Sequence, residues 1–386
     1  MRIAHVTDCY LPRRGGIELQ VQGLAKRQQA AGHDVTIVTS VAAPPGYDEG
    51  GELPVERPAA IGHDEAIRYG FAWRGRTAVL AGDYDVVHVH ASTFSPLAFF
   101  TAQATARAGV PTAMTIHSLW RRYTPLYAAA ERLTAWGDWP VAFSAVSQAA
   151  ADPLRRILRG RAEVTVLPNG VDPARWRLRP VSRTADEVRV VAVMRLAPRK
   201  RPRQLLEILR DVRRRVPARV RLYAEVIGEG PERRVLERAM RRHGMTDWVA
   251  LPGWRSAEEI GDSFARADVF IAPATLESFG IAALEARAAG LPVVARRDTG
   301  IADFVRHRRD GLLGGSDREL ADAVVELAVD RVLRERIAQH NRTVMPPVTW
   351  RDALLGASAL YQQAAALVGT QLQHPTLRAA DAASGP

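Results

Sequence analysis

Residues 269–295, VFIAPATLESFGIAALEARAAGLPVVA, decide the fold class. The apolar run at residues 269–272 is typical of a short buried strand, and residues 292–295 have the same character. Between them a polar turn leads into an alanine-rich and leucine-rich segment of helical length that carries Glu285. A strand, a helix and a second strand in this order predict a βαβ unit with parallel strands.

The same alternation of strands and helix-length segments continues on both sides of this unit. Residues 3–7 and 34–39 are expected strands on either side of a helical segment that begins after Gly15 and Gly16. Further short apolar strands are expected at residues 86–89, 112–116, 143–146, 164–167, 188–193, 221–227 and 249–251. Such strands are typical of a parallel sheet that is covered by helices on both faces.

A polar, proline-bearing stretch at residues 172–187 interrupts the alternation and is the expected linker. The sequence therefore predicts an α/β protein with two Rossmann-like domains, at residues 1–171 and 188–348. A last helix is expected at residues 349–368, and the small and polar residues of 369–386 indicate a disordered tail. Open parallel sheets bind ligands beyond the carboxyl ends of their strands, so the two domains are expected to face each other across a cleft that holds the site.

Length and composition are those of a soluble globular protein: 386 residues, 47% hydrophobic and 25% charged. No window approaches the roughly 18 apolar residues of a membrane-spanning helix. The first residues enter a strand without the pattern of an export signal, so a cytoplasmic location is expected. The single cysteine, Cys9, agrees with a reducing compartment and is interpreted as structural.

The net charge indicates an anionic partner. Lys and Arg number 53 against 42 Asp and Glu, which gives 53 − 42 = +11. Nucleic acid, an anionic membrane surface and a phosphorylated small molecule all fit this charge. Only Lys26 and Lys200 are lysines, so the excess is almost entirely arginine.

The turn and helix start at residues 277–281 form the densest candidate site. Unpaired N–H groups at a helix start bind phosphate or another anion. A carboxylate in so apolar a helix as that of Glu285 is costly unless donors satisfy it. Sugar or ribose hydroxyls are candidate donors for Glu277 and Glu285. An arginine from another helix is an equally good partner for Glu285 at this stage.

A second candidate cluster follows the strand at residues 188–193. Arg195 and Lys200 come directly after this strand and could clamp a diphosphate and stabilise it as it leaves. A solvated basic turn is the alternative. Gly228 and Gly230 follow the strand at residues 221–227, as Gly15 and Gly16 follow the first one. Each pair would allow close approach of a ligand to the backbone, and each is equally well explained as a tight turn.

Three histidines lie at or near strand ends. His117 follows the strand at residues 112–116 and could hydrogen-bond a sugar hydroxyl, although a core or surface role is as good an explanation. His88 and His90 share one face of a strand. No third ligand is evident from the sequence, so packing is favoured over a metal site. Asp83 and Asp85 imitate a metal motif, but they precede a strand and are interpreted as a turn.

Aromatic and basic residues alternate at residues 119–139 and around Trp73. A surface that contacts membrane or a lipid acceptor would use this mixture. An ordinary amphipathic helix that covers the sheet is the favoured interpretation.

Taken together, these motifs resemble the retaining, nucleotide-sugar-dependent enzymes of glycosyltransferase family 4, which have the GT-B fold. The resemblance extends from residue 1 to about residue 368 and is most specific at 277–294, where two glutamates stand eight apart before Gly-Leu-Pro-Val-Val. The supporting matches are Gly15-Gly16, Val166-Leu-Pro-Asn-Gly-Val-Asp172, Arg195 with Lys200, Gly228-x-Gly230-Pro231 and Leu251-Pro-Gly253.

The resemblance implies a role for each candidate residue. Arg195 and Lys200 would bind the donor diphosphate, Glu285 the ribose hydroxyls, and Glu277 and His117 the transferred sugar. The other implied donor-binding residues are Gly15, Gly16, Gly228, Gly230, Ser278, Phe279, Gly280 and Ile281. No cofactor or bound metal is expected, because the cations replace it. The departing phosphate oxygen would take the acceptor proton on the same face, which retains the sugar's configuration.

Three positions depart from the family pattern. Met194 stands where a glycine usually precedes the arginine, Thr299-Gly300 replaces a glycine pair, and Asp303 replaces a glutamate. The donor base, the hexose and the acceptor stay undefined. A phosphorylated or lipid-linked acceptor, with peripheral contact at the inner face of the membrane, is a hypothesis from the basic, aromatic first half. A nucleotide-sugar epimerase on the same scaffold and an arginine-rich nucleic-acid-binding protein are the competing hypotheses, and nucleic acid is the least favoured partner.

Overall fold

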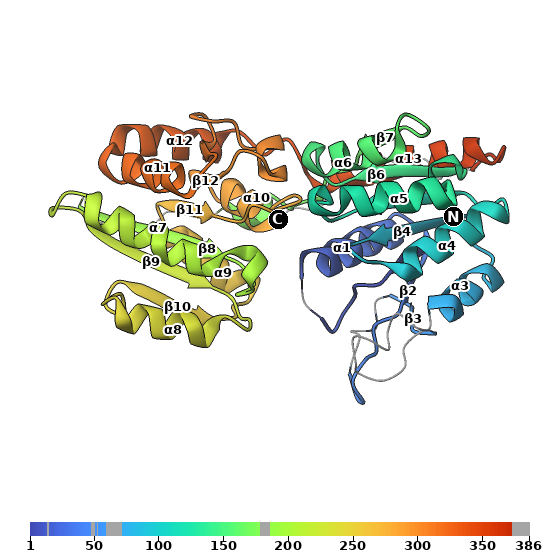
Figure 1. Ribbon diagram of the computed structural model, residues 1–386, viewed down its shortest axis with the longest axis horizontal. Coiled ribbons are helices and arrows are strands. Elements are labelled where there is room, and N and C mark those ends of the chain that lie inside the picture. The colour runs from blue at the N-terminus through green and yellow to red at the C-terminus, as the bar shows by residue number, and fades with distance from the viewer. Residues whose placement is uncertain (14, 48–50, 52, 59–71, 178–185, 373–386) are drawn as a thin grey trace. The chain divides into compact units, whose positions relative to one another are not determined.

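A computed structural model describes residues 1–386 except 14, 48–50, 52, 59–71, 178–185 and 373–386. Part of the expected linker and most of the expected tail therefore lie outside the described residues. The chain divides into two compact units (Figure 1). Unit 1 comprises residues 1–170 and 350–386, and unit 2 comprises residues 171–349.

Unit 1 is built on a seven-stranded sheet with the order β3-β2-β1-β4-β5-β6-β7. Every pair of neighbouring strands is parallel. The strands are β1 (Arg2–Thr7), β2 (Asp34–Thr39), β3 (Val55–Glu56), β4 (Val86–Ala91), β5 (Thr112–Ile116), β6 (Val141–Ala145) and β7 (Val164–Val166). Its helices are α1 (Gly16–Ala30), α3 (Ala72–Ala81), α4 (Pro96–Arg107), η1 (Arg121–Tyr123), α5 (Thr124–Thr134), η2 (Trp136–Asp138), α6 (Gln148–Leu158) and α13 (Trp350–Leu367).

The last helix, α13, shares one core with the first elements of the chain. Leu360 and Tyr361 of α13 pack in the same cluster as Val21 and Leu24 of α1 and Ile3 of β1. Glycines allow the helix to approach closely, because a Cβ on Gly23 or Gly170 would lie 2.5 or 2.6 Å from the Trp350 ring. Sequence-distant segments therefore complete unit 1.

Unit 2 is built on a six-stranded parallel sheet with the order β10-β9-β8-β11-β12-β13. The strands are β8 (Glu187–Val193), β9 (Arg221–Ile227), β10 (Val249–Gly253), β11 (Val269–Ala272), β12 (Val293–Arg296) and β13 (Gly311–Gly314). Its helices are η3 (Ala174–Trp176), η4 (Pro198–Lys200), α7 (Pro202–Arg215), α8 (Arg233–Arg242), α9 (Ala257–Arg266), α10 (Ile281–Ala288), η5 (Gly300–Asp303), α11 (Asp317–Val329) and α12 (Arg331–Thr343). The two parallel sheets confirm the predicted fold class.

Sequence patterning found the apolar strands and missed two others. β3 is only two residues long, and β13 is bounded by glycines rather than by an apolar run. Gly311 is required there by space, because a Cβ would lie 2.0 Å from the carbonyl oxygen of Val293 on the neighbouring strand. A strand that needs glycine for close backbone packing lacks the composition that usually indicates a strand.

Ser-x-x-Glu, the sequence pattern that predicts a capping box, stands at residues 256–259 and 316–319, and the first of the two boxes is complete. Ser256 accepts from the N–H of Glu259, whose carboxylate accepts from the N–H of Ser256. Ser316 caps α11 in the same way. The Glu319 carboxylate, however, accepts from the N–H of Gly315 rather than from that of Ser316. The prediction at Ser316 is therefore right for the helix start and wrong for the reciprocal bond.

A fully buried ion pair joins α10 to the turn before β13. Arg287 and Asp310 are both 0% exposed, and Nη2 of Arg287 lies 2.7 Å from Oδ1 of Asp310. Arg306 also donates to Asp310. Burial disfavours the Asp310 carboxylate, but the hydrogen bonds from Arg306 and Arg287 more than offset it and lower the pKa of this group.

We expect Asp310→Asn to destabilise unit 2 by about 3–5 kcal/mol, because it leaves a buried guanidinium without its counter-charge. Urea unfolding followed by tryptophan fluorescence measures this loss. The control is Asp298→Asn on the exposed surface, which should change stability by about 0.5 kcal/mol or less. Equal stabilities of the two variants would contradict the expectation.

Candidate active site

Two loops at the carboxyl edge of the unit 2 sheet are locked together by backbone hydrogen bonds. The N–H of Met194 donates to the carbonyl of Ile227 at 3.0 Å, and that of Leu196 to Glu229 at 2.8 Å. A Cβ on Gly228 would lie 1.9 Å from the carbonyl oxygen of Met194. The glycine at this position is thus explained by backbone packing that fixes the loop after β8.

Gly230 follows the same rule, since a Cβ there would lie 2.4 Å from the carbonyl oxygen of Leu196. Both glycines also have φ values in the left-handed half of the map, +134° and +156°. The loop that they support carries Arg195, whose side chain is exposed. Among the described residues, that side chain makes no hydrogen bond or ion pair.

Lys200 and Glu277 form an ion pair between two loops that are 77 positions apart in the sequence. Nζ of Lys200 lies 2.5 Å from Oε2 of Glu277, and the two side chains are 21% and 15% exposed. The structure therefore brings together two of the predicted site residues, at the ends of β8 and β11. Their charges largely cancel in the absence of a ligand.

Arg201 holds the lysine loop in place, a role that the sequence analysis did not assign. This residue has φ +61° at the start of α7. Its guanidinium donates to both carboxylate oxygens of Asp317 at 2.8 Å and to the carbonyl of Pro273 at 3.1 Å. The last bond ties the Lys200 loop to the segment directly after β11.

The turn from β11 into α10 has the geometry of an anion-binding helix start. Gly280 precedes α10 with φ +93°, and the first N–H groups of the helix have no acceptor within it. Phe279 is 2% exposed and its ring packs against Phe304, so only its backbone is offered to a ligand. Ser278 and Ile281, which flank these positions, are partly exposed.

Gly300 explains one departure from the family pattern. Its N–H donates to the carbonyl of Glu277 at 3.0 Å, and a Cβ would lie 2.0 Å from the carbonyl oxygen of Ser278. The glycine is therefore needed where it stands. Thr299 beside it is buried, and its hydroxyl donates a hydrogen bond to the carbonyl of Arg296. The threonine side chain therefore stabilises the turn after β12.

Glu285 is a carboxylate without a partner on α10. Within the described part of the chain it accepts no hydrogen bond and forms no ion pair, although Arg175 of η3 is a nearby positive charge. Burial raises the pKa of Glu285 to about 7, and the nearby positive charge of Arg175 acts in the opposite direction. Arg287, two positions on, faces Asp310 instead. Glu285 is thus available to accept hydrogen bonds from a ligand.

This pKa makes a prediction for stability. Between its ordinary value and about 7 the folded protein binds more protons than the unfolded chain, so Glu285 lowers stability as the pH rises through that window. Glu285→Gln removes this loss. Its free energy of unfolding, relative to that of wild type, should therefore increase by about 1–3 kcal/mol as the pH rises from 5 to 8. Urea unfolding at both pH values measures it. Exposed Glu258→Gln is the control, and a pH-independent difference for Glu285→Gln would contradict the expectation.

In unit 1, His117 lies directly after β5. It is 7% exposed, its N–H donates to the carbonyl of Ala91, and its ring hydrogen-bonds His90 at 3.0 Å. A small cavity of about 20 Å³, room for about one water, is lined by His88, His90, His117, Asn169, Gly170 and neighbouring residues. His117 is therefore held by protein groups on its buried side.

Gly15 and Gly16 begin α1, as predicted. The carboxylate of Glu18, a buried residue, comes within 2.6 Å of the place where a Cβ on Gly15 would lie. Nε of Arg13 lies 3.5 Å from Oε1 of Glu18. The chain thus supplies its own anion at this helix start, which the sequence analysis missed although Glu18 stands in the first turn.

A third histidine, which was not evident from the sequence, lies beside His88 and His90. His5 on β1 lies beside His88 in the sheet register, and ring nitrogens of His5, His88 and His90 lie within 4.8 Å of one another. The three residues are far apart in the chain, so only strand pairing reveals the cluster. The hydrogen bonds of this cluster are analysed below.

Other interpretations of unit 1 agree with the structure. Asp83 and Asp85 both bind Arg2 at a turn, and Cys9 is buried. Trp120 and Trp136 are buried, with Trp120 stacked on Tyr127 at 4.0 Å. These two tryptophans thus belong to the core rather than to a surface.

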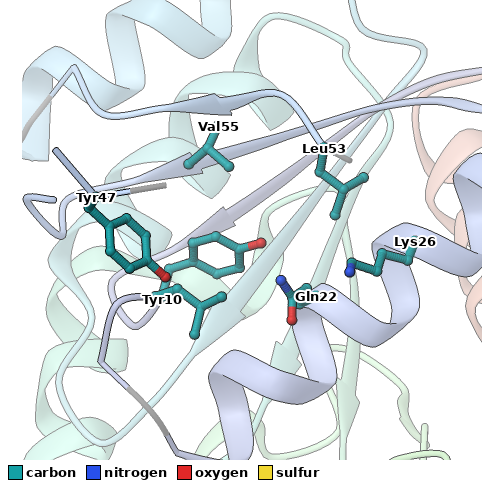
Figure 2. A pocket seen from close by; sticks show the side chains of 7 residues that line it. Tyr10, Gln22, Lys26, Tyr47, Leu53 and Val55 are labelled. Atoms are coloured by element: carbon teal, nitrogen blue, oxygen red, sulfur yellow. The ribbon is translucent and has the colours of Figure 1, made fainter. Parts of the chain in front are cut away.

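A second small cavity, of about 10 Å³, lies beside α1 (Figure 2). Tyr10 and Tyr47 line one side of it, while Gln22 and Lys26 project from α1. The sequence analysis named no residue for an acceptor and did not anticipate this cavity. Its present volume admits about one water molecule.

Comparisons with known proteins agree with this architecture. Residues 174–344 match the family model described as glycosyl transferases group 1, and residues 14–175 match that described as Glycosyltransferase Family 4. The chain is 30% identical over 324 residues to a D-inositol 3-phosphate glycosyltransferase of Stackebrandtia nassauensis, covering 74% of this chain and 70% of the relative. It is 28% identical over 350 residues to a GDP-mannose-dependent alpha-(1-6)-phosphatidylinositol monomannoside mannosyltransferase of Mycobacterium tuberculosis, covering 86% and 90%.

Solved structures share the whole fold. Sucrose-phosphate synthase from Thermosynechococcus elongatus has a TM-score of 0.73 at 20% identity, covering 94% of this chain and 98% of that one. Anabaena HepE in complex with UDP and glucose has a TM-score of 0.72 at 21% identity, covering 92% and 98%. Among the described helices, none is long and apolar enough to cross a membrane.

The two parallel-sheet units and the motifs at their strand ends define a glycosyltransferase of the GT-B fold. The chain belongs to glycosyltransferase family 4, which confirms the family resemblance of its sequence. It is therefore an enzyme that transfers a sugar unit.

Proposed function

We propose that the protein is a retaining, metal-independent glycosyltransferase. It moves a hexosyl unit from a UDP-linked or GDP-linked sugar to a hydroxyl acceptor. The observation that carries the proposal is the contact of Lys200 with Glu277 beside the first turn of α10, the helix that also carries the unpaired Glu285. All of these groups belong to unit 2. The lysine and the helix start suit a diphosphate, and the two carboxylates suit the hydroxyls of a nucleotide sugar.

The cations act on the diphosphate. Lys200 leaves Glu277 in part when phosphate oxygens arrive, and Arg195, exposed on the same loop, adds a second positive charge. Charge-assisted bonds of this kind strengthen as negative charge develops on the leaving phosphate, so they favour departure. Backbone N–H groups from Ser278 to Ile281 donate hydrogen bonds to the same phosphate oxygens, so no metal ion is needed.

The acidic groups act on hydroxyls. Glu285 accepts hydrogen bonds from the ribose hydroxyls. These bonds stabilise its charged carboxylate form and offset the cost of burial. Glu277, once Lys200 turns toward phosphate, accepts from the transferred sugar. His117 contacts that sugar as well. Gly228 and Gly230 act by allowing the backbone to pack closely, whereas Gly15 and Gly16 begin α1 beside the Glu18 carboxylate.

The relatives support a choice of substrates to test first. The mycobacterial relative is named for GDP-mannose and a phosphatidylinositol mannoside, and the Stackebrandtia relative for inositol 3-phosphate. We propose an acceptor that carries an inositol or a phosphorylated polyol, in agreement with the net charge of +11. A lipid-linked form of that acceptor would bring the enzyme to a membrane surface.

We expect Lys200→Met to weaken nucleoside-diphosphate binding about tenfold to a hundredfold, the cost of losing hydrogen bonds to a charged group. Titration calorimetry with UDP, GDP and ADP measures this loss. Lys26→Met is the matched control, because it removes the only other lysine and lies in unit 1. Equal affinities of the two variants would remove the diphosphate role of Lys200.

We also expect transfer to proceed unchanged with a chelator present and the first product to keep the anomeric configuration of the donor. Proton NMR of the reaction with GDP-mannose and an inositol acceptor reads the configuration directly. An inverted product, or activity that returns only with added Mg²⁺ or Mn²⁺, would contradict the proposal. Formation of an epimer without acceptor would favour the epimerase instead.

A further inference from the structure

A continuous line of hydrogen-bonded side chains crosses the interior of unit 1 and ends at His117. It draws on β1, β4, β5, β6, α1 and α13, and every member is buried. In order, the members are Ser144, Thr115, His88, Tyr361, Gln28, His5, His90 and His117. Because each hydroxyl has one proton and each neutral imidazole has one N–H, the donors in this line are not independent.

The direction of the line is set at its far end by a carbonyl, which can only accept. The hydroxyl of Ser144 donates to the carbonyl of Met114 at 3.4 Å. Thr115, 2.7 Å from Ser144, must then donate to the serine oxygen. Nε2 of His88, 2.7 Å from the Thr115 oxygen, must therefore carry a proton and donate.

The same logic orients Tyr361 and the amide of Gln28. With its proton on Nε2, His88 accepts through Nδ1 from the Tyr361 hydroxyl at 3.0 Å. The tyrosine oxygen, its proton used, accepts from Nε2 of Gln28 at 2.9 Å. The amide oxygen of Gln28 therefore faces the other way, toward His5.

The remaining bonds fix the tautomer of His117. Nε2 of His5 donates to Oε1 of Gln28 at 2.6 Å, and Nε2 of His90 donates to Nδ1 of His5 at 2.8 Å. Nε2 of His117 donates to Nδ1 of His90 at 3.0 Å. His117 thus keeps its proton on Nε2 and leaves Nδ1 as a bare acceptor, since Nδ1 has no hydrogen bond among the described residues.

The line requires neutral imidazoles, and burial supplies this condition. Burial lowers the pKa of His5 and of His117 to about 4, and it holds the pKa values of His88 and His90 well below the ordinary histidine value. Every ring nitrogen of His5, His88 and His90 has a protein partner.

We infer that Gln28, His5 and His90 are positioning residues, which fix His117 as the Nε2–H tautomer so that its Nδ1 accepts from a hydroxyl of the transferred sugar. The sugar part rests on the proposed function. A substrate atom that can only accept, such as a phosphate or ether oxygen, would meet a lone pair at Nδ1 and be disfavoured. The line thereby selects a hydroxyl at the His117 position.

The ring nitrogens report the tautomer directly. In ¹⁵N-histidine NMR of the full chain without ligand near pH 7, we expect His5, His88, His90 and His117 each to show a protonated Nε2 and an unprotonated Nδ1. Single-histidine variants assign the signals among the ten histidines. A proton on Nδ1 of His117, or an exchanging mixture of its tautomers in wild type, would overturn the inference.

Variants of Gln28 test whether its amide oxygen fixes the tautomer of His117. Gln28→Met removes the acceptor for His5, so an Nδ1–H form of His117 should appear and kcat/KM should fall about threefold to tenfold, the cost of one neutral hydrogen bond. Gln28→Glu keeps an acceptor oxygen and should keep the wild-type ring signals of His117. Gln20→Met is the control, because Gln20 is another buried glutamine of α1, and its bonds within the described part of the chain are to the backbone of Gly170.

Wild-type ring signals of His117 in a folded Gln28→Met protein would overturn the inference. If that variant does not fold, Tyr361→Phe removes one hydroxyl from the same line and should also release the His117 tautomer. Because the spectra are recorded on the free protein, they are independent of sugar transfer. Expected ring signals without any transfer activity would count against the proposed function alone.

Discussion

Close backbone contact at glycine is the constraint on which unit 2 depends. Gly228, Gly230 and Gly300 each lie against a carbonyl oxygen at a distance that no Cβ could share. Each contact lies at the carboxyl edge of the sheet, where it presses one strand-end loop onto the next. Main-chain packing at these glycines therefore sets the loops that carry Arg195 and Glu277, and the Arg201 side chain adds its bonds to Asp317 and Pro273.

The charged residues of α10 have two different environments. Arg287 and Asp310 are sealed inside with their charges matched, and their partnership belongs to the stability of the unit. Glu285, on the same helix, is left unmatched, and it is an acid whose burial costs folding free energy. The 100° step between successive helix residues separates the two roles, because positions two apart face different directions. Carboxylates with a raised pKa cluster at functional sites.

Much of this structure could be predicted from local patterns in the sequence. Contacts between residues that are far apart in the chain could not. The apolar runs at residues 188–193 and 269–272 were sufficient to predict strands, and the turn at Glu277 to predict a helix start, because these properties depend on neighbours in sequence. The bidentate contact of Arg201 with Asp317 spans 116 positions. The row of histidines needs the register that places His5 beside His88. Neither relation has a periodicity that a single sequence displays.

The place of α13 in the chain bears on how the enzyme is made. Unit 1 needs this helix to cover the core above β1 and α1, yet α13 is synthesised only after all of unit 2. During translation the early strands must therefore wait, with apolar surface uncovered, for the last helix to emerge from the ribosome. Such exposed intermediates are prone to aggregate. Unit 2, being continuous in sequence, has no such delay, so the later-made half of the enzyme can finish folding first.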